Sequence, residues 1–173
     1  MSDEQDMRPL GFAVATVSDT RDRASDKSGD LIAGRLREAG HSLVDRRWSA
    51  DEQWQLEAAF REWQDDPRVE VVITTGGTGI TGRDVTPEAA EAVYTKAIPG
   101  FGELFRWLSY QEIGAATIQS RAQAGLAGDT LLFNLPGSSG ACRLALDAIL
   151  LPQLDSRTRP CNFADLLPRF GER

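Results

Sequence analysis

A dense run of glycines after an apolar segment is the feature that most constrains the fold of this chain. Four glycines lie between residues 76 and 82, directly after the β-branched run Val71–Ile73. A helix start, Thr86-Pro87, follows soon after them. Closely spaced glycines cost much conformational entropy, so a plain connection would use fewer of them. The strand, the bare turn and the helix start together predict an α/β unit whose main-chain amides are open to an anion such as phosphate.

The rest of the chain repeats this alternation of strand and helix. Apolar runs predict buried strands at residues 11–18, 41–48, 69–75 and 130–135. Helical spacing of apolar residues lies between and after them, at residues 28–40, 49–64, 86–97, 103–110 and 141–150. Residues 111–129 give the weakest pattern, in which Ala124-Gly125 and Gly128-Asp129 indicate turns. The alternation predicts a mostly parallel sheet that helices cover on both faces.

Length and charge limit the class of protein. At 173 residues the chain can form one substantial core, and we expect a mobile tail at residues 1–8 and a single domain over residues 9–173. A net charge of −7 and a pI of about 4.8 argue against a nucleic-acid surface. No apolar run approaches the roughly 18–20 residues that span a bilayer. The acidic N-terminus lacks a signal-peptide pattern, which predicts a cytoplasmic protein without a membrane partner.

Cysteine and histidine are scarce in this chain. Cys142 and Cys161 form no CxxC pattern, and His41 is the single histidine. These counts argue against a disulfide framework and against a zinc site. They also leave little scope for a catalytic triad, so we expect chemistry that does not depend on a histidine.

The first glycine-rich segment is compatible with more than one kind of site. Its residues 77–82 match the dinucleotide pattern GxGxxG, whose last glycine should lie inside the helix that the loop opens. Here the best helix start is Thr86-Pro87, beyond Gly82, so the context for a nicotinamide or flavin site is missing. The P-loop pattern GxxxxGK[ST] is absent as well. A ligand-binding loop remains our interpretation, and a tight turn with no ligand remains the alternative.

A second glycine-rich segment follows the last predicted strand. Residues 135–140, Leu-Pro-Gly-Ser-Ser-Gly, lead directly into a helix. Free amides, two hydroxyl groups and the helix dipole converge there, which suits a terminal phosphate. The alternative is an ordinary serine N-cap. Because both glycine-rich segments follow the carboxyl ends of strands, we expect them to border one pocket.

Two aspartates are candidates for catalysis. Asp84 follows the first glycine-rich segment, where a carboxylate beside phosphate groups would be repelled unless a divalent cation bridges them. Asp51 lies in the pattern Ser49-Ala50-Asp51-Glu52, which matches a capping box and would place Asp51 in the first turn of a helix. The alternative for Asp84 is that it only caps a turn or pairs with an arginine. The alternative for Asp51 is that it is present only because the helix dipole favours an acidic side chain in the first turn.

Five segments together make the chain recognisable. TTGGTGITGRDVTPEA, IPGFGELFR, IQSRAQAG, NLPGSSGAC and RPCNF, spread over residues 74–163, resemble the molybdenum cofactor biosynthesis protein B family. That family is related to the molybdopterin adenylyltransferases. The resemblance covers roughly residues 10–165, and RPCNF at residues 159–163 points to the B branch.

The resemblance implies a three-layer α/β/α fold, a homotrimer or homohexamer, and a pocket for molybdopterin. It implies a cytoplasmic enzyme that adenylylates molybdopterin with MgATP, in contact with other proteins of the pathway. The alternative is a non-catalytic molybdopterin carrier. Our candidate residues are Asp84 and Asp51 for catalysis, Asp84 for Mg²⁺, and Thr75, Gly76, Gly77, Thr78, Gly79, Pro136, Gly137, Ser138 and Ser139 for substrate and phosphate binding.

Overall fold

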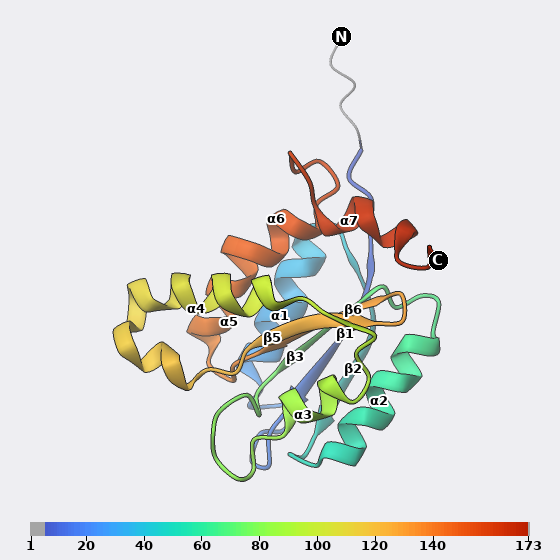
Figure 1. Ribbon diagram of the computed structural model, residues 1–173. Coiled ribbons are helices and arrows are strands. Elements are labelled where there is room, and N and C mark those ends of the chain that lie inside the picture. The colour runs from blue at the N-terminus through green and yellow to red at the C-terminus, as the bar shows by residue number, and fades with distance from the viewer. Residues whose placement is uncertain (1–5, 173) are drawn as a thin grey trace.

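The computed structural model describes residues 6–172 and is built around one central sheet (Figure 1). The sheet has six strands in the order β2-β1-β3-β6-β5-β4. They are β1 (Gly11–Val17), β2 (Ser42–Ser49), β3 (Val71–Thr75), β4 (Lys96–Ala97), β5 (Gln123–Ala127) and β6 (Thr130–Leu135). β2, β1, β3 and β6 run parallel, whereas β5 runs antiparallel to both β6 and β4. The predicted mostly parallel sheet is confirmed.

Helices connect the strands and close the chain. They are α1 (Lys27–Glu38), α2 (Gln53–Asp65), α3 (Thr86–Glu91), α4 (Pro99–Ile113), α5 (Ser139–Ala145), α6 (Leu151–Leu154) and α7 (Phe163–Leu166). A 3₁₀ helix at Gly114–Gln119 follows α4, a π-helix at Leu146–Leu150 joins α5 to α6, and a second 3₁₀ helix lies at Leu167–Arg169. In the described part of the chain, none of the helices is long and apolar enough to cross a membrane.

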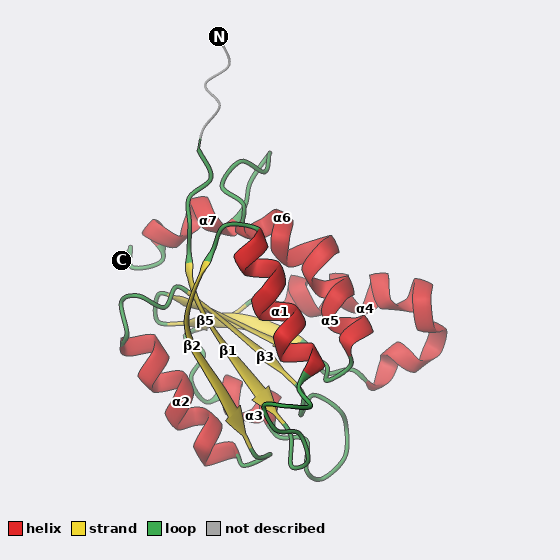
Figure 2. Cartoon of the chain, turned by 180° about the vertical axis from the view of Figure 1, so that it is seen from behind, coloured by secondary structure: helices red, strands yellow, loops and turns green. Residues whose placement is uncertain are grey.

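The helices form one layer on each face of the sheet (Figures 1 and 2). Side chains of β1 alternate between the faces, as the period of a strand requires. Phe12 and Val14 pack with α1, α4 and α5, whereas Ala13 and Ala15 pack with α2 and α3. The two buried clusters therefore lie on opposite faces of the sheet, which confirms the three-layer α/β/α arrangement.

The register of β3 and β6 brings the two glycine-rich segments side by side. Thr75 pairs with Leu135 at the last position of both strands. The N–H of Gly76 then donates to the Leu135 carbonyl at 3.0 Å. Because parallel strands end at the same edge of a sheet, both segments leave the sheet at neighbouring points, as predicted.

The start of α2 differs from the predicted capping box. Ser49 is the last residue of β2, and its hydroxyl donates to the Ala50 carbonyl at 3.0 Å. Glu52 is the residue before the helix, and no side chain caps this helix start. Pairing with β1 keeps Ser49 extended, so its hydroxyl cannot reach the helix amides. Asp51 consequently lies in a bend before α2 and not in its first turn.

The segment between α3 and β6 holds most of the other differences. The helix predicted to begin at Glu103 begins at Pro99, since proline is well suited to a first helical turn. The predicted turn at Ala124-Gly125 is wrong, because both residues belong to β5. A Cβ on Gly125 would lie 2.6 Å from the Tyr94 ring, so this glycine allows close packing and does not bend the chain.

The predicted N-terminal tail is only partly covered by the structure. Residues 1–5 lie outside the described residues. Arg8 is described, and its backbone N–H donates to the Ser156 hydroxyl at 2.9 Å. Its guanidinium donates to the Ala164 carbonyl at 3.0 Å and forms an ion pair with Glu70. These contacts tie the approach to β1 to the C-terminal segment.

Candidate functional site

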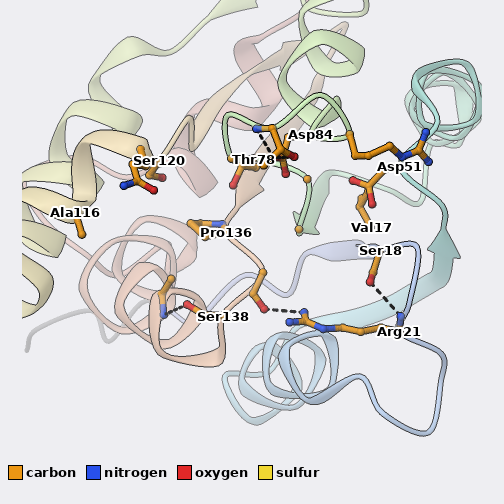
Figure 3. Close-up of a pocket in the computed structure, with 18 of the residues that line it drawn as sticks. Val17, Ser18, Arg21, Asp51, Thr78, Asp84, Ala116, Ser120, Pro136 and Ser138 are labelled. Carbon is orange, nitrogen blue, oxygen red and sulfur yellow. Dashed lines mark hydrogen bonds between the residues drawn. The ribbon is translucent and has the colours of Figure 1, made fainter.

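A pocket of about 610 Å³ opens where the parallel strands end (Figure 3). Its size lies within the usual range for small-molecule and cofactor sites. One wall is the loop after β1, a second is formed by the two glycine-rich segments, and a third comes from α4 and the 3₁₀ helix that follows it. Such pockets beyond the carboxyl ends of strands are the usual ligand sites of α/β sheets.

The first glycine loop, defined as Gly76–Gly79, begins with two glycines whose positive φ angles disfavour any other residue. Gly76 has a φ of +104°, and a Cβ there would lie 2.0 Å from the Val17 carbonyl oxygen. The hydroxyl of Thr86 donates to the Gly76 carbonyl at 2.9 Å. Thr86 therefore fixes the loop, and the N-cap residue of α3 is Val85. Steric exclusion and this bond together set the path of the loop.

The same glycines make room for the two candidate aspartates. A Cβ on Gly77 would lie 2.8 Å from Oδ1 of Asp51, and one on Gly79 would lie 2.8 Å from Oδ2 of Asp84. Each carboxylate thus lies against the bare backbone of one glycine. Within residues 6–172, the N–H groups of Gly77 and Thr78 donate to no protein acceptor. The free amide donors of the loop and the two carboxylates therefore face the same pocket.

The two carboxylates differ in their electrostatic surroundings. Burial raises the pKa of Asp51, and repulsion from Asp19 and Asp84 raises it further. Burial also opposes ionisation of Asp84, but hydrogen bonds from the hydroxyl and the N–H of Thr81, at 2.6 and 2.9 Å, outweigh it and lower its pKa. Asp84 is therefore a firmly ionised group, whereas Asp51 lies in a field that disfavours its charge.

Arg83 is paired with acids at the edge of the pocket. Its Nε and Nη2 donate to the two oxygens of Asp19, both at 2.9 Å, and its guanidinium also reaches Glu52 at 3.2 Å. The hydrogen bond from Arg83 lowers the pKa of Asp19. A bidentate pair of this kind is a strong charge-assisted contact, so the positive charge of Arg83 is already engaged.

Arg121 fixes the far side of the first glycine loop. Its N–H donates to the Thr78 carbonyl at 2.9 Å, and its guanidinium donates to the carbonyls of Gly79 and Asp84 at 2.7 and 2.8 Å. It also forms an ion pair with Glu88. One side chain thereby joins the segment after α4 to both ends of the loop that carries Asp84.

The second glycine loop is defined as Pro136–Ser139, and two buried side chains fix the carbonyl of its first residue. The hydroxyl of Thr75 donates to the Pro136 carbonyl at 2.9 Å, and the thiol of Cys142 does so at 3.3 Å. Both side chains are buried, and burial raises the pKa of the Cys142 thiol to about 11. Cys142 is therefore a neutral donor, and Thr75 supports the loop without facing the pocket.

The next carbonyl of this loop is also tied down. The Gly137 oxygen accepts hydrogen bonds from the guanidinium of Arg21 at 2.7 Å and from the hydroxyl of Ser28 at 2.9 Å. In a planar peptide the carbonyl and the following N–H point in opposite directions, so these bonds also aim the Ser138 N–H. In the described part of the chain, the N–H groups of Gly137 and Ser138 have no protein acceptor.

The two serines of the second glycine loop have different partners. The hydroxyl of Ser138 accepts from the Ala141 N–H at 3.2 Å, which makes Ser138 the N-cap of α5. The hydroxyl of Ser139 lies 3.1 Å from that of Ser28 in α1. The serine N-cap considered from the sequence is thus present, and Ser138 also lines the pocket.

The pocket brings together most of the candidate residues. Those that line it are Asp51, Gly76, Gly77, Thr78, Gly79, Asp84, Pro136, Gly137 and Ser138. Thr75 and Ser139 lie outside the lining, one beneath the second glycine loop and the other against α1. Sequence reasoning placed them next to the ligand, because adjacency in the chain does not tell which side chain points inward.

Several residues of the site were missed at the sequence level. Arg21 and Asp19 belong to the polar loop after β1. Because ligands of parallel sheets bind beyond the carboxyl ends of the strands, the position of this loop could have indicated that it lines the site. Arg83 directly precedes Asp84 in the chain and was not among the candidates. The wall made by α4 and the 3₁₀ helix was not predicted to line the site, because the helical pattern fades after residue 110.

Comparison with known proteins matches this arrangement. A family model described as "Probable molybdopterin binding domain" matches residues 13–156. Molybdenum cofactor biosynthesis protein B of Escherichia coli strain K12 is 46% identical over 155 residues, which are 90% of this chain and 91% of that protein. A crystal structure of molybdenum cofactor biosynthesis protein B superimposes with a TM-score of 0.87 at 39% identity, covering 98% of this chain and 100% of the other. The tungsten cofactor synthesizing protein MoaB from Pyrococcus furiosus superimposes with a TM-score of 0.78 at 33% identity, covering 95% and 99%.

Proposed function

This chain belongs to the molybdenum cofactor biosynthesis protein B family and carries its molybdopterin-binding domain, and we propose that it binds molybdopterin in the pocket described above and adenylylates it with MgATP. The observation that carries the proposal is the meeting of two unlike loops in one pocket. One loop offers free amides beside two carboxylates, and the other offers free amides beside hydroxyl groups. A reaction between two phosphate-bearing molecules needs two such places side by side.

The second glycine loop is the place we assign to the terminal phosphate of molybdopterin. Its unpaired N–H groups at Gly137 and Ser138 and the hydroxyl of Ser138 are donors that suit phosphate oxygens. The loop carbonyls are already bound by protein donors, so they do not repel an anion freely. These contacts support phosphate binding at the side of the pocket away from the aspartates.

The aspartates at the other side suit a divalent cation. Asp51 and Asp84 supply carboxylate oxygens, the ligands that Mg²⁺ prefers, and mutual repulsion contributes to the raised pKa of Asp51. A cation between them would relieve that repulsion, so the donor set fits Mg²⁺. When bound there with ATP, Mg²⁺ would neutralise negative charge on the nucleotide phosphates. Asp84, which is held ionised by Thr81, is the residue we assign as its main ligand.

The chemistry is a transfer between phosphates. A phosphate oxygen of molybdopterin attacks the α-phosphorus of ATP, a new P–O bond forms, and the bond from the α-phosphorus to the bridging oxygen breaks. The products are adenylyl-molybdopterin and pyrophosphate, and the electron pair of the broken bond leaves on pyrophosphate. No covalent protein intermediate is needed, so the protein contributes by positioning both reactants and by stabilising charge.

One assay tests the proposal directly. The purified protein is incubated with molybdopterin, ATP and Mg²⁺, and the products are identified by mass while pyrophosphate is quantified. We expect adenylyl-molybdopterin and an equal amount of pyrophosphate, both dependent on molybdopterin and on Mg²⁺. Binding of molybdopterin without either product would overturn the adenylyltransferase assignment and leave the carrier function in the same pathway.

We also propose that the protein works as a homotrimer or homohexamer in the cytoplasm, in contact with other proteins of the pathway. Exposed apolar side chains on α4 and the following 3₁₀ helix support self-association. Trp107 is 63% exposed and Ile118 is 83% exposed, and Tyr110 and Ile113 lie between them in the chain. Large exposed apolar patches of this kind mark interaction surfaces. Native mass spectrometry should give three or six copies, and a monomer at micromolar concentration would contradict this.

A further inference from the structure

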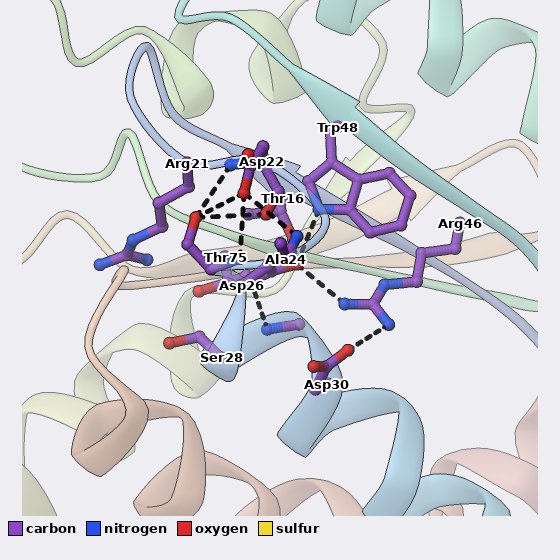
Figure 4. A network of polar contacts seen from close by, with 12 residues as sticks. Thr16, Arg21, Asp22, Ala24, Asp26, Ser28, Asp30, Arg46, Trp48 and Thr75 are labelled. Carbon is purple, nitrogen blue, oxygen red and sulfur yellow. Dashed lines mark hydrogen bonds and ion pairs between the residues drawn. The ribbon is translucent and has the colours of Figure 1, made fainter.

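Arg21 lies in a loop whose backbone is firmly held (Figure 4). Its N–H donates to the Ser18 hydroxyl at 3.0 Å. Further along, the buried carboxylate of Asp26 accepts hydrogen bonds from Thr16 at 2.5 Å, from Trp48 at 3.0 Å and from Arg46 at 2.9 Å. A second oxygen of Asp26 caps α1. The loop from β1 to α1 is therefore fixed at both ends, and the position of Arg21 at the pocket is set by the fold.

The side chain of Arg21 crosses to the second glycine loop. One Nη donates to the Gly137 carbonyl at 2.7 Å, and a Cβ on Gly137 would lie 3.4 Å from that nitrogen. A Cβ at this distance would be in ordinary contact with the guanidinium, so the Arg21 side chain lies directly against the loop. Figure 3 shows Arg21 reaching toward this loop from the side opposite Asp84. Since a guanidinium has five N–H donors in a planar fork, most of its donors are still available.

The comparison with Arg83 shows what is unusual about Arg21. These two are the basic side chains among the described residues that line the pocket. Arg83 is neutralised by Asp19 and Glu52, whereas Arg21 forms no ion pair with any carboxylate within residues 6–172. An arginine that faces a pocket with unused donors and an uncompensated charge is well suited to a phosphate group, which it can bind through two parallel hydrogen bonds.

We propose that Arg21 is a direct anion-binding residue of this pocket, where its guanidinium and the amides of the second glycine loop together hold a phosphate monoester. The Gly137 carbonyl fixes the guanidinium, and the remaining N–H groups bind the phosphate. The inference deepens the proposed function, and it rests on that function only in naming molybdopterin as the bearer of the phosphate.

Arg21 also makes the charge distribution of the pocket asymmetric. Its positive charge lies beside Ser138, whereas Asp51 and Asp84 lie at the other side (Figure 3). A ligand with a terminal phosphate is attracted to the Arg21 side, and the acidic side repels it unless a cation intervenes. The charge distribution therefore selects one orientation of the ligand, with its phosphate held against the second glycine loop.

The test uses inorganic phosphate as a probe, so that neither ATP nor molybdopterin is needed. Phosphate is titrated into ¹⁵N-labelled protein while the Ser138 amide and the Arg21 Nε–H signals are followed by NMR. In the unaltered protein both signals should shift in a saturable manner. Arg21→Gln should raise the Kd for phosphate about 10- to 100-fold, because a charge-assisted pair is lost. Arg21→Lys keeps the charge but loses the fork, so its Kd should lie between the two.

Arg23→Gln is the matched control, because it removes the same charge from the same loop. Arg23 lies over the Trp48 ring, 5.9 Å from its centroid, and does not line the pocket. The Kd of the Arg23→Gln variant for phosphate should stay within about twofold of that of the unaltered protein, since an exposed charge outside the pocket lining is largely screened. Circular dichroism checks that each variant is folded.

The possible outcomes separate this inference from the proposed function. Equal phosphate affinities for Arg21→Gln and Arg23→Gln, or no saturable shift in the unaltered protein, would overturn the role of Arg21 even where adenylyl-molybdopterin is formed. Phosphate binding that depends on Arg21, with no adenylyl product in the MgATP assay, would instead overturn the proposed reaction and leave the anion site intact. An Arg21→Lys variant as weak as Arg21→Gln would show that the fork, and not the charge alone, carries the affinity.

Discussion

The two glycine loops of the pocket are held in place by different physical means. In the first loop, glycines occupy positions where a Cβ would collide with backbone or carboxylate atoms, as at Gly76 and Gly79. In the second loop, the glycine positions are sterically more open, and side chains from other elements bind its carbonyls. A Cβ on Gly137 meets nothing closer than 3.4 Å.

This difference indicates how each loop responds to change. The first loop depends on a few positions that tolerate no side chain, so a single methyl group there should damage the fold. The second loop depends on several hydrogen bonds, each of which contributes modestly, so single substitutions should loosen it by degrees. The acids of the site lie against the first loop, whereas Arg21 lies against the second.

The largest effect is expected at Gly76. Gly76→Ala combines a φ of +104° with a Cβ 2.0 Å from the Val17 carbonyl oxygen, so β1 or the loop must move. We expect a loss of about 3 kcal/mol or more in the free energy of unfolding, measured by urea denaturation. Gly82→Ala in the same segment is the control, because a Cβ there meets nothing within 4 Å. Similar losses in both variants would contradict the steric account of the first loop.

The next effect concerns turnover and not folding. Asp84→Asn should lower the rate of pyrophosphate release at least about 100-fold, or about 2.7 kcal/mol, because the ionised carboxylate that we assign to cation binding is lost. Binding of molybdopterin should persist, since we assign its phosphate to the second loop. Asp65→Asn at the end of α2, outside the pocket lining, is the control. If the Asp84→Asn variant loses molybdopterin binding together with turnover, phosphate binding and cation binding are not separated between the two sides of the pocket as we propose.

The elements that the sequence predicts well are those whose pattern reflects burial. β1 and β6 are buried at nearly every position, so their apolar runs alone reveal them. The α2 helix shows its buried face through Leu56, Phe60 and Trp63 at helical spacing. Both glycine loops follow such strands, and the prediction that they border one pocket follows from the parallel sheet.

The poorly predicted region is one where apolar side chains are not buried. α4 and its 3₁₀ extension expose Trp107, Ile113 and Ile118, which removes the contrast between an apolar and a polar face. The 3₁₀ helix Gly114–Gln119 has no buried residue at all. Arg21 was missed for another reason, because its contact with Gly137 joins residues far apart in the chain.

A smaller effect would test how the second loop is supported. Thr75→Val keeps the shape of the buried side chain but removes the hydroxyl that binds the Pro136 carbonyl. We expect a loss of about 1–2 kcal/mol in unfolding free energy, together with weaker molybdopterin binding measured by calorimetry. Thr130→Val is the matched control, since its buried hydroxyl donates to the Val69 carbonyl at the opposite end of the sheet. Comparable stability losses with reduced affinity only in Thr75→Val would show that Thr75 acts on the ligand through the loop.

The smallest effect distinguishes by pH the two acids that lie against the first loop. The pKa of Asp51 is raised above its ordinary value of 3.8 by burial and by repulsion from Asp19 and Asp84. The Asp51 carboxylate therefore binds a proton more readily in the folded protein than in the unfolded chain. Above pH 3.8, its ionisation consequently destabilises the fold. Asp51→Asn should raise the unfolding free energy at pH 7 by less than about 1 kcal/mol, because solvent screens a partly exposed group.

Substitution of Asp84 should change the unfolding free energy in the opposite direction, so each aspartate variant serves as a control for the other. The pKa of Asp84 is lowered, because hydrogen bonds from Thr81 outweigh the effect of burial, so its ionised form stabilises the fold above pH 3.8. Asp84→Asn should thus be slightly destabilising at pH 7. The Asp51→Asn difference should shrink as the pH falls toward 3.8, whereas the Asp84→Asn difference should largely persist at pH 4 and be lost only below pH 3.8. Urea denaturation of the two variants at pH 7 and pH 4 measures these differences. If Asp51→Asn destabilises the protein at pH 7, burial and repulsion do not disfavour the ionised Asp51 carboxylate, and the case for a cation at this end of the pocket loses its electrostatic support.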